Sequence, residues 1–275
     1  MKGIKLMRNQ TIPIAFTFFI SFMPSAQPVY TTTFYESGKL RIEAYVYRPS
    51  GPGPFPVVIY SHGSRKGHEH EERPMAFVGA MLAAQGYLVV VPERRGYGKS
   101  DGQTFSGEVG TDLGGRMMAR FEEEADDVVA AIQYARTIDG ADPGRLALIG
   151  YSQGGIVSIR VAGRAPEVRA LVDQAGGSLT WPRSPELRRR LSEWARALRM
   201  PTVCMDAEND ATTEAVKTVC DTARAAGAPA EIKIYPAFAP TTNPDNIAPG
   251  HLIFSPQGVA LWREDVLAFL RAHLT

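Results

Sequence analysis

A serine flanked by glycines is the residue of this sequence whose surroundings most clearly favour chemistry. The segment from Gly150 to Gly154 reads Gly-Tyr-Ser-Gln-Gly, which has the form G-x-S-x-G, and Gly155 follows it. The motif comes directly after the apolar run Leu146 to Ile149 and opens a predicted helix. A sharp strand-to-helix turn of this kind exposes the serine hydroxyl, and its glycines avoid collisions with neighbouring backbone. We therefore predict that Ser152 is a nucleophile.

A serine hydroxyl needs a general base, and the chain has five histidines that could serve. His251 stands on a loop ending Pro-Gly-His, between the last predicted strand and the last predicted helix. Because the carboxyl ends of strands in an α/β sheet meet at one edge, this loop is expected to reach the serine. His251 is therefore the predicted base, whereas His62 is expected to be structural.

An acid must orient the histidine, and the strand predicted over 202–205 runs into Asp206-Ala207-Glu208-Asn209-Asp210. We prefer Asp210, because a loop residue four positions beyond Asp206 can turn towards the site. Asp206 can instead serve the turn hydrogen bonds that are typical of aspartate. Asp206 stays open as an alternative, and so do Asp173 and Glu208.

Acyl transfer to a serine also requires hydrogen-bond donors for the developing oxyanion. The backbone N–H of Gln153 follows the nucleophile and supplies the first donor. The second is expected from His62-Gly63-Ser64, the loop after the strand predicted over 56–60, where glycine lets the backbone approach closely. We predict Gln153 and Ser64 as the oxyanion donors, with Gly63 as the alternative to Ser64.

Apolar, β-rich runs alternate with helical patterns, which predicts a largely parallel sheet covered by helices on both faces. One helix is predicted over 122–136, with Glu122, Glu123 and Glu124 in its first turn, and another near the end of the chain. The segment 180–200 is expected to form a short helical cap. Eight strands are predicted, the first two as an antiparallel hairpin: 29–35, 41–47, 56–60, 87–91, 145–149, 169–172, 202–205 and 231–235.

The composition is that of an ordinary globular protein, with 275 residues, 44% of them hydrophobic and 21% charged. Lys and Arg number 30 and Asp and Glu number 29, so the net charge is +1 and a nucleic-acid partner is not expected. Residues 27–275 are expected to form a single domain. His68, Glu69 and His70 could together form a metal site, but adjacent charged residues on a loop are usually solvated. No metal or other cofactor is predicted.

The first 26 residues have the pattern of a signal peptide. Three basic residues precede an apolar run from Ile12 to Met23, and Ser25 and Ala26 supply the small residues of a cleavage site. The run is shorter than the roughly 20 residues that span a bilayer. We therefore expect a secreted or periplasmic chain that begins near Gln27 and has no stable membrane association.

The two cysteines leave two states open. Cys204 lies in a predicted strand and Cys220 in the next predicted helix. An oxidising compartment would allow a disulfide between them, whereas burial would also suit two reduced thiols. The sequence decides neither this question nor the oligomeric state.

These motifs resemble those of the α/β-hydrolases, nearest to dienelactone hydrolases and prolyl oligopeptidase-like serine hydrolases. The order Ser152, Asp210, His251 is that of the α/β-hydrolase triad. The resemblance implies an α/β-hydrolase fold. It also implies that the protein hydrolyses a small-molecule carboxylic ester, or a similarly activated acyl group, without a cofactor. The matching segments are Ser61-His62-Gly63, the stretch from Arg95 to Gly102, the serine motif, Glu208-Asn209-Asp210 and Gly250-His251.

Two departures from these relatives bear on the substrate. Dienelactone hydrolases proper carry a cysteine nucleophile where this chain has Ser152, so the resemblance does not extend to a dienelactone substrate. Prolyl oligopeptidases carry a large propeller domain, for which this chain has no counterpart. A peptidase or amidase is kept as the alternative, and a non-catalytic binding protein as a remote one. In a peptidase or amidase, arginines of the cap would bind a carboxylate of the substrate; otherwise they would form a solvated helix face. These arginines are Arg183, Arg188, Arg189 and Arg190.

Overall fold

An eight-stranded sheet forms the centre of the computed structural model, which describes residues 29–274. Across the sheet the order is β1-β2-β4-β3-β5-β6-β7-β8. Strand β2 pairs antiparallel with β1 and β4, and all other neighbours pair parallel. This arrangement confirms the predicted hairpin and the predicted α/β-hydrolase fold. The strands are β1 (Thr31–Ser37), β2 (Leu40–Tyr47), β3 (Phe55–Ser61), β4 (Leu88–Glu93), β5 (Ala141–Tyr151), β6 (Val168–Gln174), β7 (Thr202–Ala207) and β8 (Ala230–Tyr235).

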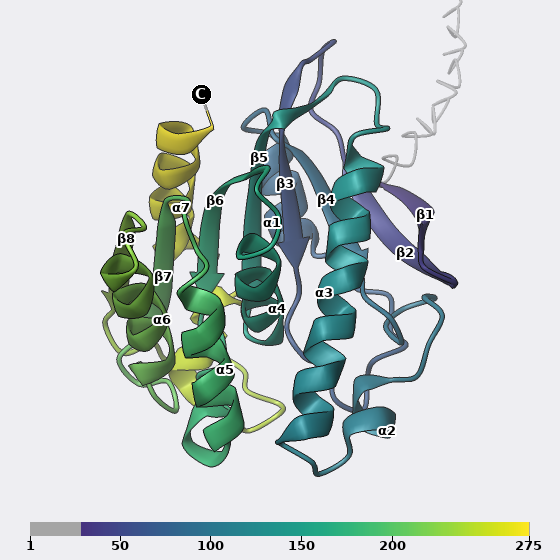
Figure 1. Cartoon of the computed structure of the whole chain (residues 1–275). Helices are drawn as coiled ribbons and strands as arrows, with labels where there is room; N and C mark the ends of the chain where they lie inside the picture. The colour runs from purple at the N-terminus through teal and green to yellow at the C-terminus, as the bar shows by residue number, and fades with distance from the viewer. Residues whose placement is uncertain (1–28, 275) are drawn as a thin grey trace, which may run out of the picture.

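Helices cover both faces of the sheet because successive side chains of each strand point to opposite faces. Val57 and Ile59 of β3 belong to one apolar core, and Val58 and Tyr60 belong to the other. The first core lies under four helices in front of the sheet in Figure 1: α3 (Gly115–Ala135), α4 (Gln153–Ala162), α5 (Pro185–Ala195) and α6 (Glu214–Ala225). The second core packs against α1 (Ala76–Ala83) and α7 (Val259–His273). Three short helices complete residues 29–274: α2 (Phe105–Val109), η1 (Trp181–Arg183) and η2 (Pro249–Phe254).

Helix α3 begins at Gly115 rather than at Glu122, so the predicted boundary was wrong. The prediction assigned three consecutive acids to the first turn, but they lie in the middle of the helix. Their charges are matched by arginines of other elements rather than by the helix dipole. The ion pairs join Glu122 to Arg160, Glu123 to Arg95, and Glu124 to Arg94.

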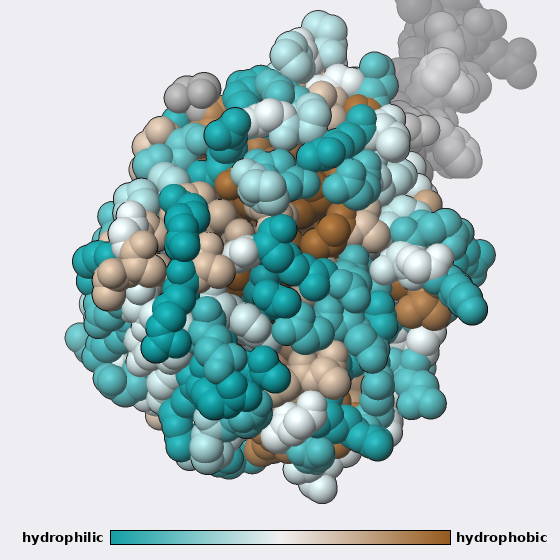
Figure 2. Space-filling view, viewed as in Figure 1, coloured by the Kyte–Doolittle hydropathy of each residue, from teal (hydrophilic) through white to brown (hydrophobic). Residues whose placement is uncertain are grey.

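The segment expected to form a cap folds as η1 and α5. Leu187, Leu191 and Trp194 of α5 are buried in the first core, so this helix is part of the helical layer. The face of the molecule that carries this layer is largely hydrophilic (Figure 2). Arg189 and Arg190 pair with glutamates of their own helix, as expected of a solvated face. A role for the segment as a cap over the site stays a prediction.

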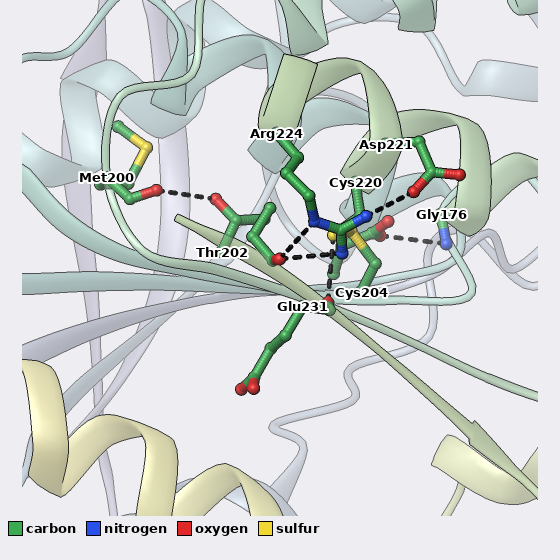
Figure 3. The surroundings of a disulfide bond; sticks show 10 residues. Gly176, Met200, Thr202, Cys204, Cys220, Asp221, Arg224 and Glu231 are labelled. Carbon is green, nitrogen blue, oxygen red and sulfur yellow. Dashed lines mark hydrogen bonds and ion pairs between the residues drawn. A yellow bond between two sulfur atoms is a disulfide. The ribbon is translucent and has the colours of Figure 1, made fainter. Parts of the chain in front are cut away.

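A disulfide joins Cys204 of β7 to Cys220 of α6 (Figure 3), which answers the question that the sequence left open. The two Cα atoms are 6.2 Å apart, within the range that a disulfide spans. Both cysteines are fully buried. The bond ties together the two elements on either side of the loop that contains Asp210.

Two observations concern membrane and export predictions. The predicted signal peptide, residues 1–26, lies outside the described residues, as does its expected cleavage site. Within residues 29–274, no helix combines the length and the apolar character needed to cross a bilayer.

Candidate active site

The serine of the G-x-S-x-G motif stands at the turn between β5 and α4. Ser152 has a φ of 55° and a ψ of −116°, a conformation that costs energy for a residue with a side chain. Its N–H donates to the carbonyl of Gln174 on the neighbouring strand β6, at 2.8 Å. The strained turn is therefore held in place, and it has the form of a nucleophile elbow.

The glycines on either side of Ser152 are required by space. A Cβ at Gly154 would lie 2.0 Å from the carbonyl oxygen of Ser61, at the end of β3. A Cβ at Gly150 would lie 2.2 Å from the carbonyl oxygen of Gly154. Neither distance is compatible with a side chain, so the close packing of strand, turn and helix depends on glycine at both positions.

The structure brings Ser152, His251 and Asp210 together from three separate loops. Nε2 of His251 lies 2.8 Å from Oγ of Ser152, and Nδ1 of His251 lies 2.6 Å from Oδ2 of Asp210. His251 belongs to η2 and Asp210 follows β7, and both side chains are buried. This geometry allows the imidazole to accept the hydroxyl proton while the carboxylate fixes its tautomer.

Asp206, the first alternative to Asp210, has other partners. It accepts hydrogen bonds from Oγ of Ser178 at 2.6 Å and from the N–H of Ala207 at 2.8 Å. Burial raises the pKa of Asp206 to about 9, and the nearby charge of Asp210 acts in the same direction. The carboxyl of Asp206 is therefore protonated at neutral pH.

The two remaining alternatives also lie away from the histidine contact. Asp173 ends β6 behind the elbow, where Oδ1 accepts from the N–H of Gly176 at 3.0 Å. A Cβ at Gly155 would lie 2.4 Å from the same oxygen, so Asp173 packs against the first turn of α4. Glu208 is exposed to solvent. Asp210 is thus the acid that hydrogen-bonds to His251.

Tyr151 holds the histidine from a second direction. Its hydroxyl donates to the backbone carbonyl of His251 at 3.1 Å, and the two ring centroids are 5.2 Å apart. Because Tyr151 adjoins Ser152 in the chain, the elbow itself contacts the predicted base. No sequence pattern indicated this contact, since the second position of the motif admits many residue types.

The loop after β3 and the start of α4 meet at the serine. A Cβ at Gly63 would lie 3.2 Å from the Cβ of Ser152, so the backbone of this loop contacts the predicted nucleophile. Gln153 is the first residue of α4, where backbone N–H groups lack an acceptor within the helix. Ser64, which follows Gly63, is exposed to solvent. These segments can supply two N–H groups to an oxyanion.

Sequence reasoning missed a buried network of charges beside this site. It connects Arg94, directly after β4, with Glu124 of α3 and with the side chain of Gln153. The only features of the sequence that indicate this network are the arginines after β4 and the three acids of α3. Those acids also fit the first turn of a helix, which is the prediction made from them above.

The loop residues weighed for a metal site have separate partners. Nδ1 of His68 lies 2.7 Å from Oε1 of Glu71, whereas Glu69 accepts a hydrogen bond from the N–H of Ser106 at 3.3 Å. Within the part of the chain that the structure describes, no group of three His, Cys, Asp or Glu side chains is placed to hold a metal ion.

Comparison with known sequences gives this geometry a family context. Residues 42–257 match the family model described as "Dienelactone hydrolase family". A protein of Escherichia coli (strain K12), described as a "Putative carboxymethylenebutenolidase", is 29% identical over 208 residues, which cover 74% of this chain and 73% of the relative. The quorum-quenching protein AidA of Acinetobacter baumannii is 29% identical over 140 residues. That match covers 51% of this chain and less than half, 41%, of AidA.

Comparison with solved structures supports the fold. A "Putative Dienelactone Hydrolase" from Klebsiella pneumoniae aligns with a TM-score of 0.64 and 23% identity, over 89% of this chain and 99% of its own. An esterase from Pyrococcus furiosus aligns with a TM-score of 0.65 and 16% identity, over 90% and 92% of the two chains. At these identities the likeness concerns the architecture alone.

Proposed function

This chain belongs to the dienelactone hydrolase family, and from that premise we propose that it hydrolyses carboxylic esters through an acyl-enzyme on Ser152. The observation that carries the proposal is the pair of contacts of His251, at 2.8 Å to Ser152 and 2.6 Å to Asp210. The strained elbow supports it, because a backbone conformation of this cost persists where it exposes a reacting group.

In the proposed reaction, Oγ of Ser152 attacks the ester carbonyl while His251 takes the hydroxyl proton. The N–H groups of Gln153 and Ser64 donate to the oxyanion of the tetrahedral intermediate. The C–O bond to the alcohol then breaks, and His251 returns the proton to the leaving oxygen. Water attacks the acyl-enzyme with His251 again as base; the bond from the acyl carbon to Oγ then breaks, His251 returns the proton to Ser152, and the carboxylic acid leaves. Asp210 accepts the Nδ1 hydrogen throughout and stabilises the imidazolium.

The nucleophile limits how far the family resemblance extends. Dienelactone hydrolases proper use a cysteine, whose thiolate forms readily, whereas a serine hydroxyl depends on its base. The half-buried contact between His251 and Ser152 supplies that base. We therefore propose ester hydrolysis without extending the proposal to dienelactones.

Peptide or amide hydrolysis has less support. In that alternative, arginines of segment 180–200 would bind a substrate carboxylate, but Arg189 and Arg190 already pair with Glu186 and Glu193. Arg188 donates to the backbone carbonyl of Trp181 at 2.6 Å. These contacts favour a solvated helix face over a recognition site.

A panel of p-nitrophenyl esters of increasing acyl length, measured beside aminoacyl anilides, tests the function. We expect turnover of esters, and a fall in kcat of up to about 10⁶-fold in Ser152→Ala or His251→Ala. Thermal unfolding of each variant controls for folding. Undiminished turnover by a folded Ser152→Ala, or a preference for the anilides, would contradict the proposal.

A further inference from the structure

The side chain of Gln153, whose backbone is a proposed oxyanion donor, is fastened to a buried carboxylate. Its Nε2 donates to both oxygens of Glu124, at 2.9 Å and 2.8 Å. The hydroxyl of Tyr97 donates to its Oε1 at 3.3 Å. Both polar ends of the amide are therefore held, which restricts how the first residue of α4 can move.

The second proposed donor segment is fastened to the same carboxylate through one arginine. Nη2 of Arg94 donates to the backbone carbonyl of His62 at 2.9 Å, and Nε of Arg94 donates to Glu124 at 2.7 Å. Because the peptide unit is planar and trans, holding the His62 carbonyl also fixes the direction of the Gly63 N–H. The loop that leads into Ser64 is thus oriented by Arg94.

Arg94 and Glu124 are both charged although both are buried. Neither Arg94 nor Glu124 is exposed to solvent. Burial alone would raise the pKa of Glu124, but the charges of Arg94 and Arg120 outweigh it and lower the pKa. A buried ion pair contributes little net stability compared with apolar packing, so stability alone does not account for it. Its fixed, directional hydrogen bonds suit the positioning of backbone.

We propose that Arg94 and Glu124 are positioning residues that set the distance between the two oxyanion donors. Arg94 follows β4 and Glu124 lies on α3, two parts of the chain that carry none of the three triad residues, and they act through His62 and Gln153. The inference rests on the proposed serine hydrolase function. It adds that the oxyanion site depends on one buried carboxylate, that of Glu124, which pairs with Arg94 at 2.7 Å and with Arg120 at 3.0 Å.

A neighbouring ion pair provides a matched control. Arg95 follows Arg94, and Asp127 lies one helical turn from Glu124; Nη2 of Arg95 donates to Oδ1 of Asp127 at 2.8 Å. Asp127 is also fully buried, and its side chain further accepts hydrogen bonds from Ser37 of β1 at 2.7 Å and from the N–H of Arg95 at 2.9 Å. Asp127→Asn therefore disturbs a similar network without touching Gln153 or His62.

The test compares Glu124→Gln with Asp127→Asn in the whole protein. Displacing an oxyanion donor rather than deleting it should lower kcat about 10- to 100-fold in Glu124→Gln, with KM nearly unchanged. The inhibition constant of a trifluoromethyl ketone, which adds to the serine to give an oxyanion, should rise by the same factor. Asp127→Asn should lower the melting temperature while kcat and the inhibition constant stay near those of the wild type.

The possible failures are distinguishable. If the wild type neither hydrolyses esters nor reacts at Ser152 with a fluorophosphonate, the proposed function is wrong and the inference falls with it. If the wild type does both, an unchanged kcat and inhibition constant in Glu124→Gln, or an equal loss in Asp127→Asn, would overturn the inference alone. Should Glu124→Gln not fold, Arg94→Lys is judged by the same criteria, since lysine cannot donate to His62 and Glu124 in the same geometry.

Discussion

Asp206, in β7, and Asp210, just after it, have different surroundings although they lie four residues apart. Asp210 accepts a hydrogen bond from Nδ1 of His251 at 2.6 Å. Asp206 is buried and hydrogen-bonded to Ser178, and its pKa is raised to about 9. The two carboxyls are thus suited to different tasks, that of Asp210 at the histidine and that of Asp206 as a neutral group.

Asparagine replacements separate these roles. Asp206→Asn imitates the protonated carboxyl, so kcat/KM for an ester should change by less than about tenfold, which is 1.4 kcal/mol of transition-state stabilisation. Asp210→Asn should lower kcat by about 10⁴-fold, as when the aspartate of a serine protease triad is replaced. Steady-state kinetics near pH 7 measure both. A large loss in Asp206→Asn with activity retained in Asp210→Asn would reverse the assignment.

The residues that could be predicted are those marked by local backbone requirements. Ser152 is indicated by the glycines beside it, and Asp210 and His251 are indicated by the predicted strands that end before them. The structure brings these three side chains together. Glu124 and Tyr151 were missed because their roles depend on contacts with residues distant in the chain. An ion pair across about thirty positions produces no periodicity that a single sequence reveals.

At the scale of elements, Asp173 joins the end of β6 to the first turn of α4. It is fully buried, and its Oδ2 has no hydrogen-bond partner among residues 29–274. Burial raises its pKa from an ordinary value of 3.8 to about 7. Between these two values the folded protein keeps a proton that the unfolded chain has released. The free energy of unfolding therefore falls as the pH rises from about 4 to about 7.

Asp173→Asn should remove this dependence, because the amide is neutral throughout and keeps the oxygen that accepts from Gly176. The melting temperature of the variant, relative to the wild type, should rise between pH 4 and pH 8. Three pKa units correspond to roughly 4 kcal/mol as an upper limit. Asp142→Asn, which removes an acid whose pKa is lowered by Arg145, should show no such gain. A constant difference for Asp173→Asn across the pH range would show that Asp173 ionises normally in the folded protein.

The elements themselves were largely predictable from short-range pattern. Apolar runs bounded by glycine and proline indicated all eight strands, because buried strands need such runs and turns need such residues. The start of α3 was wrong because its acids pair with distant arginines. The place of α5 in the helical layer could not be read from its own sequence, since an apolar stripe does not say which surface it contacts.

At the scale of the whole molecule, the fold brings residues that are far apart in the sequence close together in space. The segments that follow β5, β7 and β8 carry the three triad candidates, and parallel strands bring such segments to one edge of the sheet. The strand pattern therefore predicted the assembly. It did not predict the disulfide between Cys204 and Cys220, which requires knowledge of how α6 packs on β7. The signal peptide over residues 1–26, and with it export, stays a prediction.

The covalent intermediate tests the central claim most directly, because it depends on the folded arrangement of all these segments. The protein would be mixed with a p-nitrophenyl ester, quenched with acid during turnover, digested, and examined by tandem mass spectrometry. We predict the mass of the acyl group on Ser152, and its absence from Ser152→Ala treated in the same way. Ester turnover with the acyl group on another residue, or with no acylated peptide at any quench time, would contradict the account.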